Sequence, residues 1–382
     1  MSDALDKLRP LTPYLAKAAS FAPSFCKYLA VALVVLNIGS FPGFWHARVF
    51  RSVILLRIQW RLFQLKNMFK SQKRKDELEA KWMEDLTPIG ADPFTLCVPY
   101  DTRARIDDSD FNLHLSNSSY AKTLDSARFK AAMAAWPNFF VAGGWMPLAA
   151  THYHFIREIP MLAPYQVRIR VGAWDQKWLY VVCRFVTMPK KGAKKHIEKP
   201  PTPTAEPSAD PSNLSMHIIS TPADEFTSSA PTPNPNAVPA PGATEKTLKG
   251  VAAGLSFEED DGAIVHTVSV SQMCFKIGRI TVPPALVFAT NGFSQPAPEG
   301  EAPYSPANPP PHWATVQSIG VKAKGGSVKK MRDLLKGGWK EVPEAERWWE
   351  QALGGPVEER NKACLPAFQK IVGGMEAVRG LH

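Results

Sequence analysis

The stretch DDSDFNLHLSNSSYAKTLDSAR, residues 107–128, decides the fold of this chain, because a cluster of polar side chains runs directly into a helical pattern. Ser116 can cap a helix that starts after it. Small and apolar residues then recur at helical spacing, and the set is Tyr120, Leu124, Ala127, Ala131 and Ala135. Alanines at these positions would let the helix sit close to a curved sheet wrapped around it. An ordinary core helix that uses alanine for its helix propensity is the alternative interpretation.

Segments with strand-like patterns surround this helix, and each is bounded by Pro, Gly or Asp. The predicted strands are residues 93–106, 147–159, 165–174, 177–188 and a long, bent last strand over 263–282. The tetrapeptide WDQK between the third and fourth strands is a hairpin-turn candidate. One strand, one helix and then four strands indicate an α+β fold, in which a single helix packs against an antiparallel sheet.

Two segments of low complexity interrupt this pattern. Residues 189–262 are rich in Pro, Ser and Thr and poor in large apolar residues, so we expect a disordered insertion. Residues 294–311 form a shorter Pro-rich linker before a C-terminal helical region, 312–382. The folded α+β domain is therefore expected to consist of residues 93–188 and 263–293.

The N-terminal part combines an uncharged run with a strongly basic stretch. After an N-terminal segment, 1–27, the apolar run at 28–46 gives roughly 27 Å of helix, close to the roughly 30 Å of a bilayer core, which predicts a membrane anchor. Residues 47–82 are predicted to form a basic amphipathic helix on an anionic lipid surface. This excess of Lys and Arg predicts that the bulk of the protein stays on the cytosolic side. A buried core helix and a targeting peptide are the alternative interpretations of the apolar run.

Composition disfavours several other classes of protein. The net charge is +10, but base-stacking motifs and a basic folded domain are missing, so no nucleic-acid partner is expected. The cysteines are five in number and have neither disulfide nor zinc spacing. His152 and His154 alternate along one predicted strand without a third ligand, so we expect strand histidines and no metal or other cofactor.

The spacing of Asp108, Asp110, His114 and Tyr120 resembles the D-x-D-x-x-x-H-x-N-N-x-x-Y pattern of hotdog-fold thioesterases of the 4-hydroxybenzoyl-CoA thioesterase type. The segment LAATHYHFIREIPMLAPYQVRIRVGAWDQKWLYVVCRFV is similar to the strands of thioesterase superfamily member 6 proteins, which are membrane-anchored hotdog proteins. FKIGRITVPP resembles the last strand of their fungal relatives. The resemblance implies a hotdog fold, an antiparallel sheet wrapped around a central helix, with an N-terminal anchor helix.

The resemblance also implies an activity, the hydrolysis of an acyl-CoA thioester to free acid and CoA. Asp110 matches the family's catalytic carboxylate, and His114 and Asn117 flank the helix start, where they would hold the turn or orient water. A carboxylate beside a helix N-terminus can act as base or nucleophile while the free N–H groups stabilise an oxyanion. The expected substrate contacts are Asp108, Ser116, Tyr120, Arg157, Lys276 and Arg279, of which the last three are cations suited to the phosphates of CoA.

Other interpretations remain open at this point. The aspartates can be ordinary loop residues that form Asx turns, with His114 as a partner. Leu113 stands where the family pattern has Gly, and Ser116 stands where it has Asn, which favours a non-catalytic hotdog protein that binds acyl groups or serves as a membrane scaffold. A thioesterase acting on acyl carrier protein would need a transit peptide, and the N-terminus has Asp3 and Asp6 and few arginines. The expected partners are acyl-CoA, membrane lipid and a second copy in a homodimer, at the endoplasmic reticulum or another intracellular membrane.

Overall fold

The polar stretch leads into helix α5, Asn117–Ala135, as the sequence predicts. The computed structural model describes residues 12–188, 259–379 and 381. Ser116 precedes the helix in an extended conformation, although its side chain bonds to other serines and not to the helix backbone. Every member of the predicted stripe is buried, and these residues are Tyr120, Leu124, Ala127, Ala131 and Ala135. The small side chains therefore let α5 lie against the sheet, and the prediction of a buried face is confirmed.

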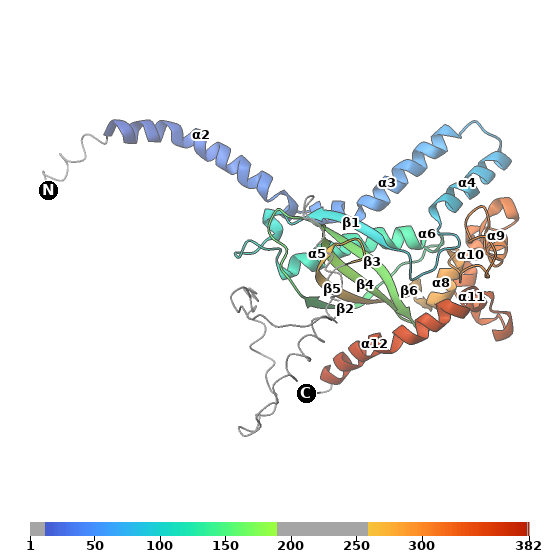
Figure 1. The fold of residues 1–382 in the computed structure, drawn as a ribbon. Helices are drawn as coiled ribbons and strands as arrows, with labels where there is room; N and C mark the ends of the chain where they lie inside the picture. The colour runs from blue at the N-terminus through green and yellow to red at the C-terminus, as the bar shows by residue number, and fades with distance from the viewer. Residues whose placement is uncertain (1–11, 189–258, 380, 382) are drawn as a thin grey trace, which may run out of the picture. The chain divides into compact units, whose positions relative to one another are not determined.

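Five antiparallel strands form the sheet that packs on α5, in the order β1-β3-β4-β5-β2 (Figure 1). The strands are β1 Val98–Arg103, β2 Leu148–Phe155, β3 Pro164–Trp174, β4 Leu179–Thr187 and β5 Ile264–Met273. A single helix against an antiparallel sheet of this order is the α+β hotdog arrangement expected from the sequence. Asp175 closes the β3–β4 hairpin, because its Oδ1 accepts hydrogen bonds from the N–H groups of Lys177 and Trp178.

The predicted long last strand is three strands. β5 ends at Met273, and a short hairpin follows, β6 Phe275–Ile277 and β7 Ile280–Val282. The chain leaves the ladder at Cys274, whose N–H bonds to the carbonyl of Pro147, and it turns at Gly278, where φ is +59°. A positive φ favours glycine, so this residue allows the tight turn.

The N-terminal prediction needs correction. Instead of one helix over 28–46, the chain forms helix α2 Thr12–Leu36, the 3-10 turn η2 Ile38–Ser40 and then α3 Phe44–Lys66. The apolar run is interrupted between Leu36 and Phe44, where Gly43 adopts φ +83° and no helix can continue. In the described part of the chain, no helix combines the length and the apolar content that crossing a bilayer requires.

The basic segment 47–82 also differs from the single helix that was expected. It consists of α3 and a second helix, α4 Gln72–Leu86. α3 ends at Lys66, and the side-chain amide of the next residue, Asn67, donates to the carbonyl of Phe63. The aromatic rings of Trp60 and Phe63 then pack on Trp82 at centroid distances of 5.8 and 4.9 Å. Apolar side chains on both helices therefore favour a hairpin over one continuous helix.

Further helices lie around and after the sheet. Around the core lie η3 Ile106–Asp108, α6 Pro137–Val141 and α8 Pro284–Thr290. The C-terminal region contains α9 Trp313–Gly320, η5 Lys322–Lys324, α10 Val328–Leu335, η6 Gly338–Lys340, η7 Glu344–Glu346, α11 Trp348–Ala352 and α12 Gly355–Arg379. The Pro-rich segment 294–311 contains no helix or strand, and it is tied down where the N–H of Ser294 bonds to the carbonyl of Ala91.

Helix α12 packs on the face of the sheet opposite to α5. The ring of Phe368 stacks on Tyr180 at 5.5 Å, and Asn361 exchanges two hydrogen bonds of 2.9 Å with the backbone of Trp174. Phe368 comes so close to Gly172 that a Cβ there would lie 2.5 Å from its ring. The absence of a side chain at this position lets the helix approach β3. Residues 189–258 of the predicted insertion 189–262 and residues 1–11 of the N-terminal segment 1–27 lie outside the described residues.

Candidate active site

The loop before α5 is held against the segment that follows β2. The N–H of Leu115 donates to the carbonyl of Ile159 at 2.8 Å, and His114 forms an isolated antiparallel bridge with Pro160. A second bridge joins Ser109 to Leu115 within the loop itself. The loop thus has a defined path, which places Asp110 and His114 just before the N-terminus of α5.

Asp110 organises the tip of this loop. Its Oδ1 accepts hydrogen bonds from the N–H groups of Asn112 at 3.0 Å and His114 at 3.3 Å. These are the Asx-turn contacts that the sequence allows as an alternative to catalysis. The other carboxylate oxygen, Oδ2, makes no hydrogen bond to any residue that the structure describes. Asp110 can therefore cap the turn through one oxygen and still present the second one to a ligand.

Leu113 occupies the left-handed region of backbone space, with φ +63°. This is the residue that replaces the Gly of the family pattern, and it keeps a backbone conformation that glycine adopts at little cost. Its N–H bonds to the carbonyl of Asp110, and its carbonyl accepts from Met161. Surrounding hydrogen bonds therefore hold a leucine in a conformation that costs about 1–2 kcal/mol.

We predict that Leu113→Gly stabilises the protein. Leu113 is 60% exposed, so little buried apolar area is lost, while the strain of a positive φ is removed. The expected gain is at most about 1 kcal/mol, because glycine also increases the entropy of the unfolded chain. Urea unfolding of the two proteins measures it. Phe111→Gly is the matched control, since Phe111 is 92% exposed and has no positive φ, and this change should not stabilise.

His114 faces an acid that the sequence pattern does not include. Its Nδ1 lies 3.0 Å from Oε2 of Glu158, which is an ion-pair distance. The geometry of the two groups does not meet the criteria of a hydrogen bond. Both side chains are partly exposed. The pair orients the imidazole next to the turn of Asp110. No motif pointed to Glu158, because it lies 44 positions after His114 and only the tertiary fold joins the two.

The first turn of α5 offers free backbone donors. The carbonyl of Ser116 accepts a hydrogen bond from the N–H of Ser119, and the N–H of Ser116 donates to the carbonyl of Asp108. The N–H groups of Asn117 and Ser118 make no hydrogen bond within the described residues, as is usual for a helix N-terminus. The side chains of both residues are exposed. A negatively charged oxygen placed here would be stabilised by these donors and by the helix dipole.

Asp108 is buried beneath the loop and is only 3% exposed. Its Oδ1 accepts a 2.8 Å hydrogen bond from Lys122 of α5, and its Oδ2 lies 3.6 Å from Arg48 of α3. Arg48 also donates to Thr102 and Thr123. Burial acts to lower the pKa of Arg48, but its hydrogen bond to Tyr100 and the charge interactions with Tyr100, Tyr165 and Asp108 together raise it above its usual range. Both carboxylate oxygens of Asp108 thus interact with cations, so this residue stabilises the position of the loop. The predicted contact of Asp108 with substrate stays a prediction.

Tyr120 lies inside the core and is 2% exposed. Its ring makes edge contacts with Phe155 and Phe185 at 5.2 and 4.9 Å. Burial raises the pKa of Tyr120, while the nearby polar groups of Thr267 and of the Ile159 backbone act in the opposite direction. The residue therefore joins the start of α5 to β5, at the base of the candidate site.

The three cations proposed for CoA phosphates do not gather in one place. Arg157 follows β2, close to the loop, and its N–H bonds to the carbonyl of His266. Lys276 and Arg279 belong to the β6–β7 hairpin, beyond the far end of β5. Strand β5 alone extends about 20 Å from Thr267, which lies near Tyr120, to Met273, which precedes the hairpin. Within one chain, Lys276 and Arg279 are thus separated from Asp110, and their predicted role remains untested.

His266 is a buried histidine of β5 behind the site. Its Nε2 lies 2.8 Å from the Thr187 hydroxyl, and its Nδ1 lies 2.9 Å from the carbonyl of Glu158. Burial lowers the pKa of His266 below 6.5, and the nearby charge of Arg157 acts in the same direction, while its backbone hydrogen bonds oppose the shift. The neutral imidazole is the form that fits this site.

This lowered pKa predicts a loss of stability in acid. Above pH 6.5 the imidazole is neutral in both the folded and the unfolded chain. As the pH falls below 6.5, the unfolded chain binds the proton more readily, so the free energy of unfolding decreases until the folded pKa is passed. Urea unfolding at pH 7.5 and pH 5.5 should show a smaller loss in His266→Gln than in the parent. His152→Gln, at an exposed position of β2, should keep the parent's loss.

No group of three or more His, Cys, Asp or Glu side chains within the described ranges could hold a metal ion. His152 and His154 lie on the edge strand β2, opposite Val270 and Val268 of β5. They share a face of the strand and have no third ligand beside them. The polar groups of the site are instead suited to acid–base chemistry and hydrogen bonding.

Comparisons with known proteins identify similar sequences and structures. Residues 104–198 match the model of the Thioesterase-like superfamily, which confirms the resemblance seen in the sequence. A thioesterase of Purpureocillium lilacinum is 30% identical over 195 residues, covering 42% of this chain and 59% of the relative. A probable thioesterase of Saccharomyces cerevisiae is 28% identical, covering 44% and 66%, and protein THEM6 of Danio rerio is 30% identical, covering 22% and 43%. The chain thus spans less than two thirds of these relatives.

Among solved structures, a 1,4-dihydroxy-2-naphthoyl-CoA thioesterase from Synechocystis matches with 7% identity and a TM-score of 0.28, covering 52% of this chain and 96% of that one. The assignment of the hotdog fold rests on the strand order and the central helix described above.

Proposed function

We propose that this chain, whose hotdog domain matches the Thioesterase-like superfamily, hydrolyses an acyl-CoA thioester to a free acid and CoA. The observation that supports this most directly is the loop at residues 108–116. It places the unbonded Oδ2 of Asp110 and the imidazole of His114 immediately before a helix N-terminus with free N–H groups. Base, orienting group and oxyanion donors then come from one continuous stretch of chain.

The reaction assigns a role to each of these groups. Asp110 takes a proton from water, and the water oxygen forms a bond to the thioester carbon. The carbonyl oxygen becomes negative and is stabilised by the N–H groups of Asn117 and Ser118. When the intermediate collapses, the C–S bond breaks, and the CoA sulfur leaves as a thiolate that takes up a proton. His114, held by Glu158, orients the water, and Asn117 can contact the acyl oxygen through its amide.

We further propose that two copies assemble through β2. Among the strands that the structure describes, β2 pairs with β5 alone, so the N–H and C=O groups along its other edge are available for pairing. Leu148 and Phe155 expose large apolar side chains at its two ends. Pairing of β2 with its counterpart would extend the sheet across the dimer and bring a second copy close to the polar loop. Arg157 lies directly after this edge and could then contact the CoA of either subunit.

Release of free CoA from a series of short-chain to long-chain acyl-CoAs tests the proposed activity. The full-length chain in mild detergent should release CoA with saturation kinetics on at least part of the series. If a folded preparation releases no CoA above the uncatalysed rate on any chain length, the assignment as a hydrolase is rejected. Size determination of the same sample tests the dimer.

A second candidate function is a hotdog module that binds acyl groups without hydrolysing them. Two observations favour it: Asp110 serves as a turn cap, and Leu113 replaces the Gly of the family pattern. Binding of a non-hydrolysable acyl-CoA thioether, together with an inactive but folded protein, would establish this function in place of catalysis.

For localisation, we propose association with the surface of an anionic intracellular membrane. Helices α2 and α3 expose many large apolar side chains, and α3 adds exposed basic ones, Arg51, Arg57 and Arg61. The exposed apolar residues of these helices include Phe25, Tyr28, Leu29, Val31, Leu33, Val34, Phe50, Ile54, Leu55, Ile58, Leu62 and Leu65. Apolar side chains flanked by cations are typical of helices that lie in the headgroup region.

Vesicle sedimentation gives a quantitative prediction for this surface. The protein should bind vesicles containing phosphatidylserine more strongly than vesicles of phosphatidylcholine alone. The double variant Arg51→Ala/Arg61→Ala should lose about 2 kcal/mol of binding free energy, roughly thirtyfold in affinity, because each cation near the surface contributes about 1 kcal/mol. Equal binding to both vesicle types would argue against an electrostatic contribution.

A further inference from the structure

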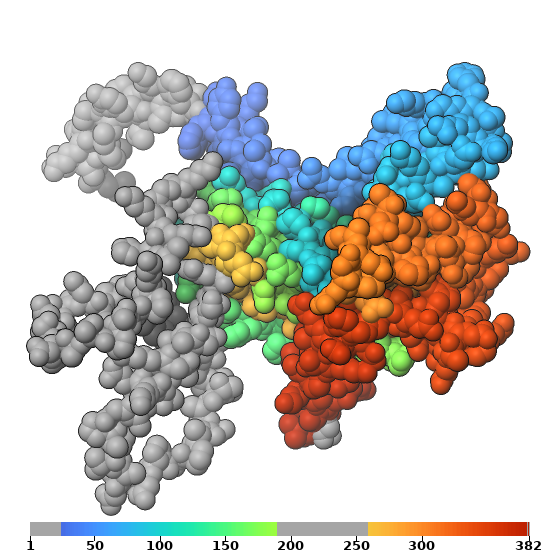
Figure 2. Space-filling model, turned by 45° about the vertical axis from the view of Figure 1, so that its right-hand side comes forward, coloured from blue at the N-terminus to red at the C-terminus, as the bar shows by residue number. Residues whose placement is uncertain are grey.

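A cavity of about 580 Å³ lies between the α3–α4 hairpin and the C-terminal helices. Its walls come from α3, α4, the second half of α5, α6, α9 and α10. Figure 2 shows the α3–α4 segment and these C-terminal helices adjoining one another on one face of the molecule. A volume of this size is within the range of small-molecule sites in proteins.

This cavity is distinct from the candidate active site. α5 contributes Phe129 and Met133 to its lining, whereas Asn117 at the other end of α5 belongs to the site. At 1.5 Å of rise per residue, these side chains are about 18 and 24 Å along the helix from Asn117. The loop of Asp110 is not part of the lining.

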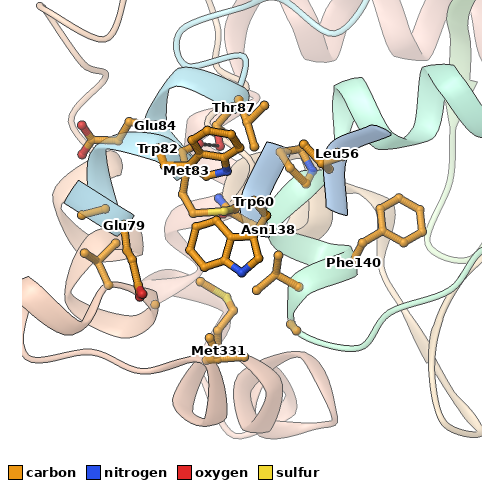
Figure 3. Close-up of a pocket in the computed structure, with 18 of the residues that line it drawn as sticks. Leu56, Trp60, Glu79, Trp82, Met83, Glu84, Thr87, Asn138, Phe140 and Met331 are labelled. Atoms are coloured by element: carbon orange, nitrogen blue, oxygen red, sulfur yellow. Dashed lines mark hydrogen bonds between the residues drawn. The ribbon is translucent and has the colours of Figure 1, made fainter. Parts of the chain in front are cut away.

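The lining is dominated by aromatic and thioether side chains. Figure 3 shows Trp60, Trp82, Met83 and Met331 gathered around the cavity, with the carboxylates of Glu79 and Glu84 on one side. The full set of these apolar groups is Trp60, Trp82, Trp313, Phe129, Phe140, Met83, Met133 and Met331. Methionine adapts its shape to irregular apolar ligands, and indole rings supply large flat surfaces.

The acidic groups of the walls already have partners. Glu84 of α4 accepts a 2.6 Å hydrogen bond from Gln317 of α9, and Glu79 pairs with Lys322 of η5 at 3.9 Å. Asp76 accepts from Gln72 within α4. The lining cation Arg57, which is exposed, has no hydrogen bond or ion pair with any described residue.

We propose that the cavity binds a single-chain amphiphile with an anionic head, of which a long-chain carboxylate is the simplest example. The aliphatic tail would replace water among the indoles and methionines, and the carboxylate would lie near Arg57. A peptide segment is a poorer fit. Its N–H and C=O groups would need partners in the cavity, and the polar lining groups Thr87, Glu84 and Asn138 are occupied by other contacts.

Titration of the full-length chain with dodecanoate, by calorimetry, tests this proposal without any thioester. Bromine-labelled dodecanoate in a parallel experiment should quench tryptophan fluorescence, because Trp60, Trp82 and Trp313 line the cavity. Both titrations should saturate. Asp110→Asn should bind dodecanoate as well as the parent does, so that the result does not depend on the proposed hydrolysis.

Two variants decide where the ligand lies. Ala80→Trp places an indole inside the cavity and should weaken binding at least about tenfold, since the tail loses the apolar area that it would bury. Ala47→Trp adds the same side chain at an exposed position of α3 outside the lining and should bind like the parent. Circular dichroism and the melting temperature establish that both variants are folded.

The head group is tested separately. Arg57→Gln should weaken binding of dodecanoate about threefold to fivefold, the scale of an exposed ion pair, and leave binding of dodecanol unchanged. Absence of saturable binding, or equal binding by folded Ala80→Trp and Ala47→Trp, would overturn the proposal. An equal loss of dodecanol and dodecanoate in Arg57→Gln would show that the site accepts the tail alone and that the assignment of an anionic head is wrong.

Discussion

Asp110→Asn is expected to lower kcat/KM for acyl-CoA hydrolysis by roughly a hundredfold or more, the effect of removing a general base or nucleophile. The substitution is well matched to the structure. Asn retains an Oδ1 that can accept the N–H groups of Asn112 and His114, so the turn keeps its hydrogen bonds. The free Oδ2 is replaced by an uncharged NH2 group, which is neither a base nor a nucleophile. A change in activity then reports on chemistry and not on the path of the loop.

The measurement is CoA release by equal amounts of folded parent and variant, with Asp101→Asn as control. Asp101 is an exposed residue of β1 that accepts a hydrogen bond from Gln166 and lies outside the loop. The control should retain the activity of the parent. An Asp110→Asn protein as active as the parent would exclude this carboxylate as base or nucleophile and would direct attention to His114 and Glu158.

The largest expected effect on stability belongs to Asp108→Ala. Asp108 is buried and paired with both Arg48 and Lys122, so its removal leaves two cations without a carboxylate beneath the loop. Removal of one partner from a buried ion pair typically costs about 3–5 kcal/mol. Arg48 is also the link from α3 to Thr102 of β1 and Thr123 of α5, and we expect α3 to detach more easily from the hotdog core.

Urea unfolding of four proteins separates the ion pair from other losses. If the ion pair is the cause, the double variant Arg48→Ala/Asp108→Ala will be destabilised by less than the sum of the two single variants. Each single variant leaves one charge of the pair without its partner, whereas the double variant removes both charges. Strict additivity, or a cost for Asp108→Ala below about 1 kcal/mol, would mean that water or Lys122 alone satisfies the remaining charge.

Local signals were sufficient for the hotdog core. The stripe of Tyr120, Leu124 and Ala127 and the short β-rich segments predicted α5 and its sheet, because burial of one face imposes its period on the sequence. The cluster of Asp108, Asp110 and His114 was found for a similar reason: its members are close in sequence and together form one turn. Interactions between residues that are close in the sequence depend on the spacing of those residues, so a sequence pattern can predict them.

Contacts between distant segments could not be found in this way. Glu158 beside His114 and Arg48 beside Asp108 are joined only when the sheet and α3 have packed. The apolar run at 28–46 suggested one spanning helix, yet α2 stops at Leu36 and α3 begins at Phe44. Hydropathy counts apolar residues without regard to backbone conformation, and residues 37–43 leave the α-helical path, with Gly43 at a positive φ directly before α3.

The amino-acid sequence by itself determined the α+β class, the central helix and the turn that presents Asp110, because each depends on the spacing of nearby side chains. Only the tertiary structure decided which charges neutralise Asp108, that Lys276 and Arg279 lie away from the loop, and that α3, α4, α9 and α10 enclose an apolar cavity. These features depend on segments far apart in the chain. The positions of these segments are set by the apolar surface that they bury against one another, and the spacing of residues within one segment does not predict that packing.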